Sequence, residues 1–334
     1  MNYRVKTTSG KEFEIKPSET ILEASIKAGV NLPYGCRSGS CGSCKAKVLE
    51  GSVVHDEIMP GVITQEEELD GYHLFCRAFA MSDIKIDDQP AKFDQGILPK
   101  ITPVRVESLK KLNHDVMQMI LKLPAEEKLR FKAGQYIEFI LNDGSRRAFS
   151  MANSPHEDLV ELHIRLIEGG QFTNFVFAEM QEKSIHRIEG PLGQFYLRES
   201  ERPIIFIAGG TGFAPIKSII NDMLFNQNKR EIILYRGVRK KIDLYQEVVV
   251  NNWLKSDLNI KVHNVFSDEE DSEIKNQLVH EAVLENTSQI NEYEVYCCGA
   301  PAMVEVAHES FVNNGLLNSR FYSDAFTFSP KKNN

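Results

Sequence analysis

The sequence predicts a multidomain α+β and α/β protein whose three segments differ in their pattern of strands and helices. Its 334 residues are enough for two or three separate hydrophobic cores. Four cysteines lie within residues 36–76, short strands separated by turns fill the middle of the chain, and strands alternate with helices from residue 203 onward. We therefore expect three domains with different architectures.

The composition and net charge of the chain argue against several classes of protein. Hydrophobic residues make up 42% of the chain, and its net charge is −8. Because an acidic chain lacks the basic field that gathers phosphates, we expect no nucleic-acid partner. The first residues contain no apolar core of a secretory signal, and no stretch reaches the ~18 apolar residues of a membrane span. These features predict a cytoplasmic protein without a membrane span.

The first segment is expected to begin with two strands and a short helix. Residues 2–8 and 12–16 are typical of a hairpin. Apolar residues at helical spacing over residues 21–28 predict an amphipathic helix. Returning strands are expected at residues 45–49 and 83–87.

Four cysteines give this segment its chemistry. Cys36, Cys41 and Cys44 follow a C-x4-C-x2-C spacing, and Cys76 supplies a distant fourth thiol, which is the pattern of plant-type [2Fe–2S] sites. Two bridged iron ions need four converging thiolates, and a glycine-rich loop can supply three of them. Zinc sites usually use two close cysteine pairs, and a cytosolic chain would not keep disulfides. We therefore expect these four cysteines to be cluster ligands.

Residues 1–90 as a whole resemble a plant-type ferredoxin, which implies a β-grasp fold. The acidic residues Glu66, Glu67, Glu68 and Asp70 are either a docking surface for a redox partner or simply a solvated surface. Residues 91–103 contain proline and glycine without periodicity, and they are expected to form a linker.

Residues 104–199 are expected to form an antiparallel β-barrel. Strands are clearest at residues 116–123, 136–141 and 159–167, with glycine-containing turns between them and one helix near residues 173–178. Arg147-Ala148-Phe149-Ser150 ends one strand, and Gly169-Gly170 precedes the helix that contains Thr173. The N–H groups and hydroxyl at this helix start would face an anion.

Residues 200–334 are expected to form a parallel sheet with helices on both faces. The first strand runs into Gly209-Gly210-Thr211-Gly212, and Pro215 follows in the first turn of a helix, so that the backbone can approach a pyrophosphate. The last central strand ends at Cys298 and Gly299. An isolated cysteine of this kind is more often a small core thiol than a functional one.

Together these motifs resemble the ferredoxin–NADP⁺ reductase superfamily. Arg147–Ser150 resembles its R-x-Y/F-S flavin motif, and Gly169–Thr173 resembles its pyrophosphate turn. Gly209–Pro215 is similar to the G-G-T-G-x-A-P nicotinamide-nucleotide motif, and Tyr296–Met303 is similar to the C-G-x-P-x-M strand end. An aromatic residue near the C-terminus often covers the flavin in this superfamily, which implies Phe326, with Phe328 as the second candidate.

The resemblance implies a role for each matching residue. Arg147 would contact the flavin pyrophosphate, Phe149 would pack near the isoalloxazine, and Ser150 would bond the ring near N5. The catalytic residues would be Ser150, Cys298 beside the nicotinamide, and Phe326. The residues placed at the flavin are Arg147, Ala148, Phe149, Ser150, Gly169, Gly170 and Thr173, and those at the nicotinamide nucleotide are Gly209, Gly210, Thr211, Gly212, Pro215, Cys298, Gly299 and Phe326.

Motifs for a [2Fe–2S] cluster, a flavin and a nicotinamide nucleotide follow one another along the chain, and together they predict an electron-transfer route. A nicotinamide gives two electrons together and a [2Fe–2S] cluster accepts one, so a flavin is needed between them. The resemblance implies FAD, which usually accompanies an N-terminal ferredoxin domain. NADH is expected over NADPH because Asp268, Glu269 and Glu270 follow Ser267 and would repel a 2′-phosphate. The alternative that remains open is a phosphate site formed by Arg236, Arg239, Lys240 and Lys241.

The physiological acceptor is predicted from the subgroup that the chain resembles. Four stretches are similar to the CDP-6-deoxy-Δ3,4-glucoseen reductases: Cys36–Ala46, Ala133–Ile137, Phe206–Lys217 and Phe321–Phe326. This resemblance implies a pyridoxamine-phosphate dehydrase of 3,6-dideoxyhexose biosynthesis as the partner enzyme. The alternative is the reductase component of a multicomponent oxygenase of the phenol hydroxylase type. A redox-sensing or electron-storage protein is the third hypothesis, and the intact nicotinamide turn argues against it.

Overall fold

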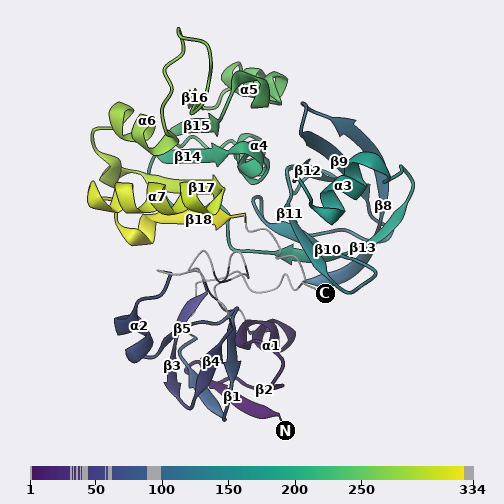
Figure 1. The fold of residues 1–334 in the computed structure, drawn as a ribbon, viewed down its shortest axis with the longest axis vertical. Coiled ribbons are helices and arrows are strands. Elements are labelled where there is room, and N and C mark those ends of the chain that lie inside the picture. Colours follow the sequence, from purple (N-terminus) through teal and green to yellow (C-terminus); the bar gives the residue numbers. More distant parts are fainter. Residues whose placement is uncertain are drawn as a thin grey trace. The chain divides into compact units, whose positions relative to one another are not determined.

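The computed structural model describes residues 2–30, 32, 34, 37, 39, 44–56, 58, 62–88 and 99–326. It divides into two compact units, Met1–Leu98 and Pro99–Asn334 (Figure 1). In the described residues no helix has both the length and the apolar character that crossing a membrane requires.

The first unit is a small mixed sheet with one well-capped helix. Its five-stranded sheet has the spatial order β2 (Glu12–Ile15), β1 (Tyr3–Thr7), β7 (Ile84–Ile86), β3 (Lys45–Glu50) and β5 (Tyr72–Leu74), and a second pair joins β4 (Val53–His55) to β6 (Ala78–Ala80). Helix α1 (Ile21–Lys27) begins with a capping box in which Thr20 and Glu23 bond each other's backbone N–H. The predicted hairpin is confirmed, because β1 and β2 pair antiparallel.

The acidic run of the first unit forms a short helix whose carboxylates have partners within the unit. Helix α2 (Gln65–Leu69) begins with a capping box between Thr64 and Glu67. Glu67 also lies 2.7 Å from the ammonium of Lys45, and Glu68 lies 3.5 Å from Nδ1 of His55. Two of these acidic side chains therefore support the local fold.

The second unit begins with an antiparallel barrel, as predicted. Its strands follow the order β11 (Arg146–Ser150), β10 (Tyr136–Ile140), β13 (Ile185–Leu192), β8 (Lys100–Lys111), β9 (Val116–Lys122) and β12 (Val160–Arg165), and every pair is antiparallel. A bridge between Met151 and Leu162 joins the two outer strands. Alternate residues of β8 and β9 point inward, and Val106 and Met119 are fully buried in the barrel core.

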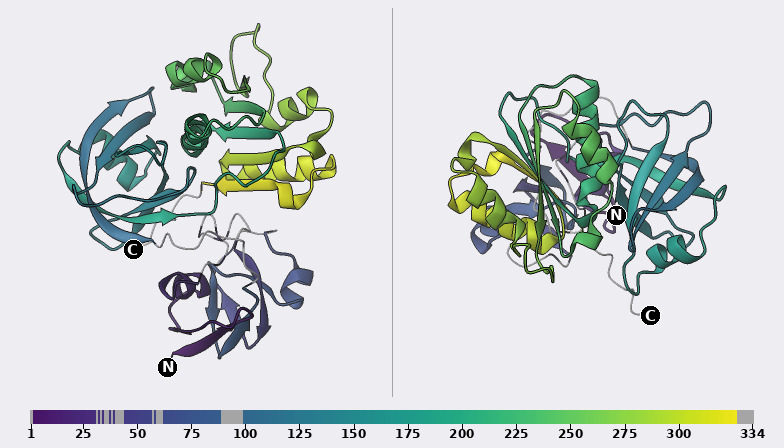
Figure 2. Two further views of the ribbon diagram at one scale, coloured as in Figure 1. Left: turned by 180° about the vertical axis from the view of Figure 1, so that it is seen from behind. Right: turned by 90° about the horizontal axis from the view of Figure 1, so that it is seen from above.

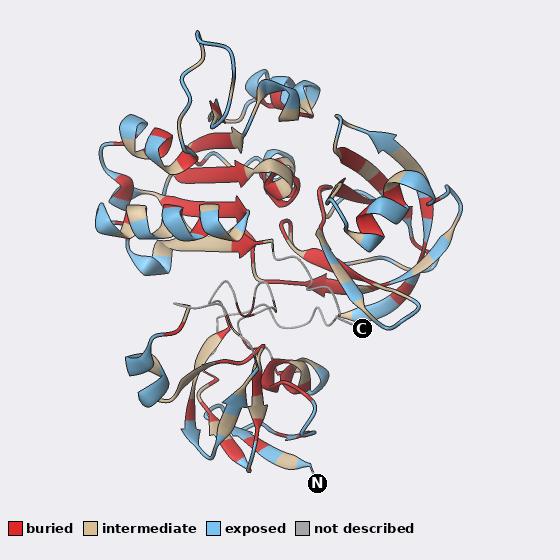
Figure 3. Cartoon of the chain, viewed as in Figure 1, coloured by how far each residue is buried: buried red, intermediate tan, exposed pale blue. Residues whose placement is uncertain are grey.

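The barrel is followed by a parallel sheet, which is also as predicted. Its order is β16 (Ile260–Phe266), β15 (Ile232–Val238), β14 (Ile204–Gly209), β17 (Glu294–Gly299) and β18 (Phe321–Ala325). The longer helices α4 (Phe213–Phe225), α5 (Glu247–Leu254), α6 (Val279–Asn286) and α7 (Pro301–Asn313) cover both faces of the sheet (Figure 2). Burial is greatest along β14, β15 and β17 (Figure 3), as their continuous apolar runs require.

Helix α4 links the parallel sheet to the barrel through polar groups. The hydroxyl of Ser218 donates to the carbonyl of Asn153 over 2.6 Å, and the ammonium of Lys217 donates to the carbonyl of Ala152 over 3.1 Å. Both side chains are buried. Because α4 begins at the glycine turn, these contacts tie that turn to the barrel.

Candidate functional site

Two of the four predicted cluster ligands lie within the described part of the first unit. Cys44 precedes β3 and Cys76 follows β5, and the antiparallel pairing of these strands brings their sulfur atoms to 3.1 Å. Both side chains are buried. Two buried thiols from distant segments fit part of a four-thiolate site. Cys36 and Cys41 lie outside the described residues, so their role as ligands stays a prediction.

The two predicted flavin motifs meet on the barrel. Phe149 of β11 lies 5.5 Å, centroid to centroid, from Phe172 in the first turn of α3 (Gln171–Ala178), and it makes an edge contact at 6.0 Å with Phe139. Phe149 therefore packs onto the barrel core with part of its surface exposed. Arg147 lies two residues earlier on the same face of the strand, and its guanidinium donates to the carbonyl of Arg146.

The glycine pair before α3 forms a tight turn that its own threonine stabilises. Gly169 has a φ of +71°, and a Cβ on Gly170 would lie 2.7 Å from the hydroxyl oxygen of Thr173. That oxygen accepts a hydrogen bond from the N–H of Ile167 over 3.2 Å. Thr173 thus holds the turn, and the N–H groups of the first turn of α3 remain the groups suited to an anion.

Ser150 and Cys298 come together through an aspartate that the sequence analysis missed. The hydroxyl of Ser150, at the end of β11, lies 3.5 Å from Oδ2 of Asp324 on β18. Asp324 is the register partner of Cys298 on the neighbouring strand β17. Burial raises the pKa of the Cys298 thiol well above its ordinary value, and the charge of Asp324 raises it further, so this thiol keeps its proton.

The glycine turn and the end of β17 pack directly on each other. A Cβ on Gly212 would lie 2.1 Å from the carbonyl oxygen of Cys298, and a Cβ on Gly209 would lie 2.6 Å from the sulfur of Met303. Gly299 has a φ of +151°, within the region that favours glycine. The two motifs that the sequence predicted separately therefore form one backbone surface.

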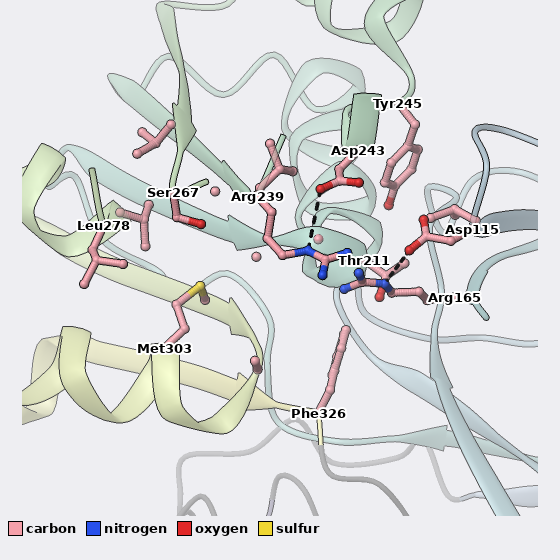
Figure 4. Close-up of a pocket in the computed structure, with 18 of the residues that line it drawn as sticks. Asp115, Arg165, Thr211, Arg239, Asp243, Tyr245, Ser267, Leu278, Met303 and Phe326 are labelled. Atoms are coloured by element: carbon pink, nitrogen blue, oxygen red, sulfur yellow. Dashed lines mark hydrogen bonds and ion pairs between the residues drawn. The ribbon is translucent and has the colours of Figure 1, made fainter. Parts of the chain in front are cut away.

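A cavity of about 350 Å³ opens beside this surface. It is lined by Asp115, Val116, Arg165, Ile167, Gly209, Gly210, Thr211, Gly237, Val238, Arg239, Asp243, Tyr245, Val265, Ser267, Gln277, Leu278, Val279, Ala300, Met303 and Phe326. The labelled side chains converge on it from the barrel and from the parallel sheet (Figure 4). Its size and its mixture of apolar walls with a few polar groups suit a nucleotide-sized ligand.

Arg165 is a cavity residue that the sequence analysis did not select. It ends β12 of the barrel, and its Nε donates to Asp115 over 2.8 Å. A Cβ on Gly210 would lie 3.4 Å from Nη1 of Arg165, so the guanidinium stands beside the glycine turn. No local signal distinguishes it, because β12 has a polar residue at every second position and Arg165 is only the last of three.

Arg236 of β15 and the three basic residues that follow this strand all lie beside acidic side chains. Arg236 is buried, and its guanidinium pairs with Glu247 over 2.6 Å. Lys240 pairs with Glu270, and the N–H of Lys241 donates to Glu269 over 2.6 Å. Arg239 lines the cavity, and its Nε lies 3.8 Å from Asp243.

Phe326 lies at the cavity edge, as Figure 4 shows. Its N–H donates to the carbonyl of Gly299 over 2.8 Å, and its ring packs against the core of the parallel sheet. Whether this ring covers the flavin stays a prediction. The second candidate, Phe328, lies outside the described residues.

Three family models match successive parts of the chain. They are the 2Fe-2S iron-sulfur cluster binding domain over residues 5–81, the oxidoreductase FAD-binding domain over residues 103–196 and the oxidoreductase NAD-binding domain over residues 206–309.

Curated relatives and a solved structure match along nearly the whole chain. The CDP-6-deoxy-L-threo-D-glycero-4-hexulose-3-dehydrase reductase of Yersinia pestis is 36% identical over 95% of this chain and 96% of that protein. The terephthalate 1,2-dioxygenase reductase component 1 of a Comamonas species is 33% identical over 99% of both chains. The crystal structure of the Amycolatopsis cytochrome P450 reductase GcoB has a TM-score of 0.84 at 30% identity and covers 98% of this chain and 99% of its own. The chain therefore belongs to the ferredoxin-reductase family of iron–sulfur flavoproteins, oxidoreductases in which a 2Fe–2S domain, an FAD-binding domain and an NAD-binding domain form one electron-transfer protein.

Proposed function

We propose that this reductase delivers electrons from NADH to a dehydrase that acts on a CDP-linked 6-deoxyhexulose, in the synthesis of a dideoxyhexose. The observation that carries the proposal is the 36% identity with a dehydrase reductase over 95% of the chain. The convergence of Ser150, Asp324 and Cys298 beside the glycine turn supports a site where a nicotinamide can meet a flavin. When bound, the flavin accepts the electron pair and passes single electrons onward.

The side chains of the site hold and orient the bound cofactors and take no part in bond making themselves. Arg165 and the N–H groups of the glycine turn offer positive potential to a pyrophosphate. Cys298 is small and keeps its proton, so it fills space beside a nicotinamide without a charge. Asp324 accepts a hydrogen bond from Ser150 and fixes that hydroxyl in place. Phe326 supplies an aromatic ring at the cavity edge.

The experiment that tests the partner assignment pairs the purified reductase with two classes of acceptor. We expect NADH oxidation to couple to formation of a 3-deoxy sugar product when the dehydrase and its CDP-hexulose substrate are present. An oxygenase component should receive electrons at least tenfold more slowly. A faster rate with the oxygenase would overturn the dehydrase assignment in favour of the second candidate, which the 33% identity with a dioxygenase reductase supports.

We further propose that the acidic loop after β16 favours NADH over NADPH. Glu269 and Glu270 face the basic turn of Lys240 and Lys241, and Ser267 lines the cavity beside them. A 2′-phosphate placed here would meet these carboxylates. Replacing Glu269 and Glu270 together by Ala should raise kcat/KM for NADPH by about 2- to 30-fold, because the interaction of one exposed carboxylate with a charge is worth about 0.2–1 kcal/mol.

The matched control removes a carboxylate of the same kind from elsewhere on the sheet. Glu231 pairs with Lys261 over 3.1 Å before β15, at the end opposite the glycine turn. Glu231→Ala should leave the ratio of NADPH to NADH turnover unchanged. A wild-type enzyme that prefers NADPH would show that the basic turn, not the acidic loop, governs the choice.

A further inference from the structure

Tyr245 connects the cavity to a chain of buried polar side chains that reaches into the barrel. Its side chain lines the cavity, and its phenol points toward Thr211 (Figure 4). The hydroxyl lies 3.2 Å from Nδ1 of His163, whose Nε2 lies 2.9 Å from Oε1 of Glu161. The ammonium of Lys217 on α4 completes the chain 2.6 Å from Oε2 of Glu161.

The charges of these four side chains determine which atom donates and which accepts in each hydrogen bond between them. Burial alone would raise the pKa of Glu161, but the hydrogen bond from His163 and the charge of Lys217 outweigh burial and lower that pKa, so the carboxylate is ionised and only accepts. Burial lowers the pKa of His163, which is therefore neutral. Its single ring proton must sit on Nε2 to reach Glu161. Nδ1 is then an acceptor, and the hydroxyl of Tyr245 donates its only proton to it.

The phenol of Tyr245 is also held rigidly by its packing. Its ring makes edge contacts with Phe213, the first residue of α4, at 5.6 Å and with His163 at 5.2 Å. Only 4% of the residue is exposed, and the guanidinium of Arg236 donates to its backbone carbonyl. The oxygen atom therefore has a fixed position and a fixed hydrogen-bonding sense at the cavity wall.

We propose that Tyr245 accepts a hydrogen bond from a ribose hydroxyl of the bound nicotinamide nucleotide. With its proton committed to His163, the phenol offers only lone pairs to the cavity. An ionised phosphate has no proton to donate, whereas a ribose hydroxyl has one. Thr211 belongs to the turn suited to a pyrophosphate, and a ribose is the donor group joined directly to a pyrophosphate. His163, Glu161 and Lys217 are positioning residues that act through Tyr245.

This inference rests on the proposed use of the cavity by a nicotinamide nucleotide, and equilibrium binding tests it. Tyr245→Phe keeps the ring and removes the oxygen, and it should weaken the binding of NAD⁺ and of ADP-ribose alike by about 3- to 10-fold, the value of one net hydrogen bond. His163→Phe keeps the phenol but frees its proton to turn toward the cavity. Because a ribose hydroxyl can also accept a hydrogen bond, this change should weaken both ligands less than Tyr245→Phe does, and the two changes should be non-additive.

The controls separate positioning from stability. Tyr235→Phe removes a buried hydroxyl from β15, where the ring stacks on His263, and it should leave both affinities unchanged. Variants of Tyr245 and His163 that lose thermal stability but bind both ligands as the wild type does would overturn the inference. Loss of NAD⁺ affinity alone would also overturn it, because the donor would then be the nicotinamide amide. A wild-type protein that binds neither ligand would instead refute the use of the cavity by a nucleotide.

Discussion

At the scale of single residues, the site depends on polar side chains whose partners are distant in the sequence. Ser150 and Asp324 are 174 positions apart, yet their side chains meet across the barrel and the parallel sheet. Cys44 and Cys76 meet in the same way because β3 and β5 are antiparallel neighbours. In both cases strand register, rather than local sequence, determines which atoms can act together.

Replacing Cys76 by Ser tests whether this residue is a ligand of the cluster. An alcohol does not replace a thiolate at iron, so we expect loss or strong alteration of the [2Fe–2S] signal in electron paramagnetic resonance, while FAD remains bound in the separate second unit. Cys297→Ser, which changes a buried thiol of the parallel sheet, is the control and should keep the signal. An unaltered signal in the Cys76 variant would remove this residue from the ligand set.

Phe326→Ala tests whether the ring at the cavity edge competes with the nicotinamide. Removing a displaceable ring should tighten NAD⁺ binding by about 2- to 10-fold, since such stacking is worth about 0.5–1.5 kcal/mol, and should speed oxygen consumption by the reduced protein. Titration with NAD⁺ and an oxygen electrode measure the two effects. Phe225→Ala, at the exposed end of α4, should change neither. If only stability falls in the Phe326 variant, the ring is an apolar plug.

At the scale of elements, the glycine turn is a joint between two strands and a helix. β14 delivers the chain into the turn, α4 carries it toward the barrel, and the carbonyl end of β17 closes against Gly212. The position of α4 therefore depends on how closely two backbones approach. A side chain at Gly212 would separate them.

Gly212→Ala should destabilise the second unit and weaken nucleotide binding together. The added Cβ would meet the Cys298 backbone at 2.1 Å, and a backbone atom cannot rotate away as a side-chain end can. We expect a loss of about 1–3 kcal/mol in the free energy of unfolding, measured in urea. Gly144→Asn is the control, because this turn glycine has open space around it and asparagine tolerates its φ of +79°. Equal costs at the two positions would show that the close approach is not a constraint.

At the scale of the whole molecule, a row of buried, hydrogen-bonded side chains joins the barrel to helix α4 and to the segment before α5. Its members are Glu161, His163, Lys217 and Tyr245. The side chain of His163 is fully buried, and the charged or titratable groups that face it are Glu161, Lys217 and Tyr245. Because burial lowers its pKa, protonation of His163 favours the unfolded chain. The stability that it contributes is complete above the ordinary histidine pKa of about 6.5 and is lost as the pH falls below that value.

The urea midpoint of the flavin-loaded protein should therefore be steady from pH 8 to 7 and should decline below about pH 6.5. Glu161, whose pKa is also lowered, adds a further loss when the pH falls below its ordinary range near 4.5. His163→Phe should show a shallower decline between pH 6.5 and 5 than the wild type does. Parallel curves for the two proteins would contradict the assignment of this loss to His163.

A feature of the fold or of the site could be predicted from the sequence when its cause lies within a few neighbouring residues. The glycine turn before Pro215 and the paired glycines before α3 were predictable, because a close backbone approach needs glycine at that very position. Asp324, Arg165 and the pair of Glu161 with Lys217 were not, because each is an ordinary polar residue until the register of distant strands and helix α4 gives it a partner. Strand ends also differed by one or two residues from the predicted ranges 136–141 and 159–167, which became β10 and β12, because their limits depend on neighbouring strands.

The separation of the chain into two compact units has a consequence for how such proteins diversify. Met1–Leu98 contains its own sheets and its own pair of thiols, and Pro99–Asn334 contains the barrel, the parallel sheet and the cavity. A substitution that suits the first unit to another electron acceptor need not disturb packing in the second. Recombination at the boundary between them would exchange the unit that contains the paired thiols and keep the unit that contains the cavity.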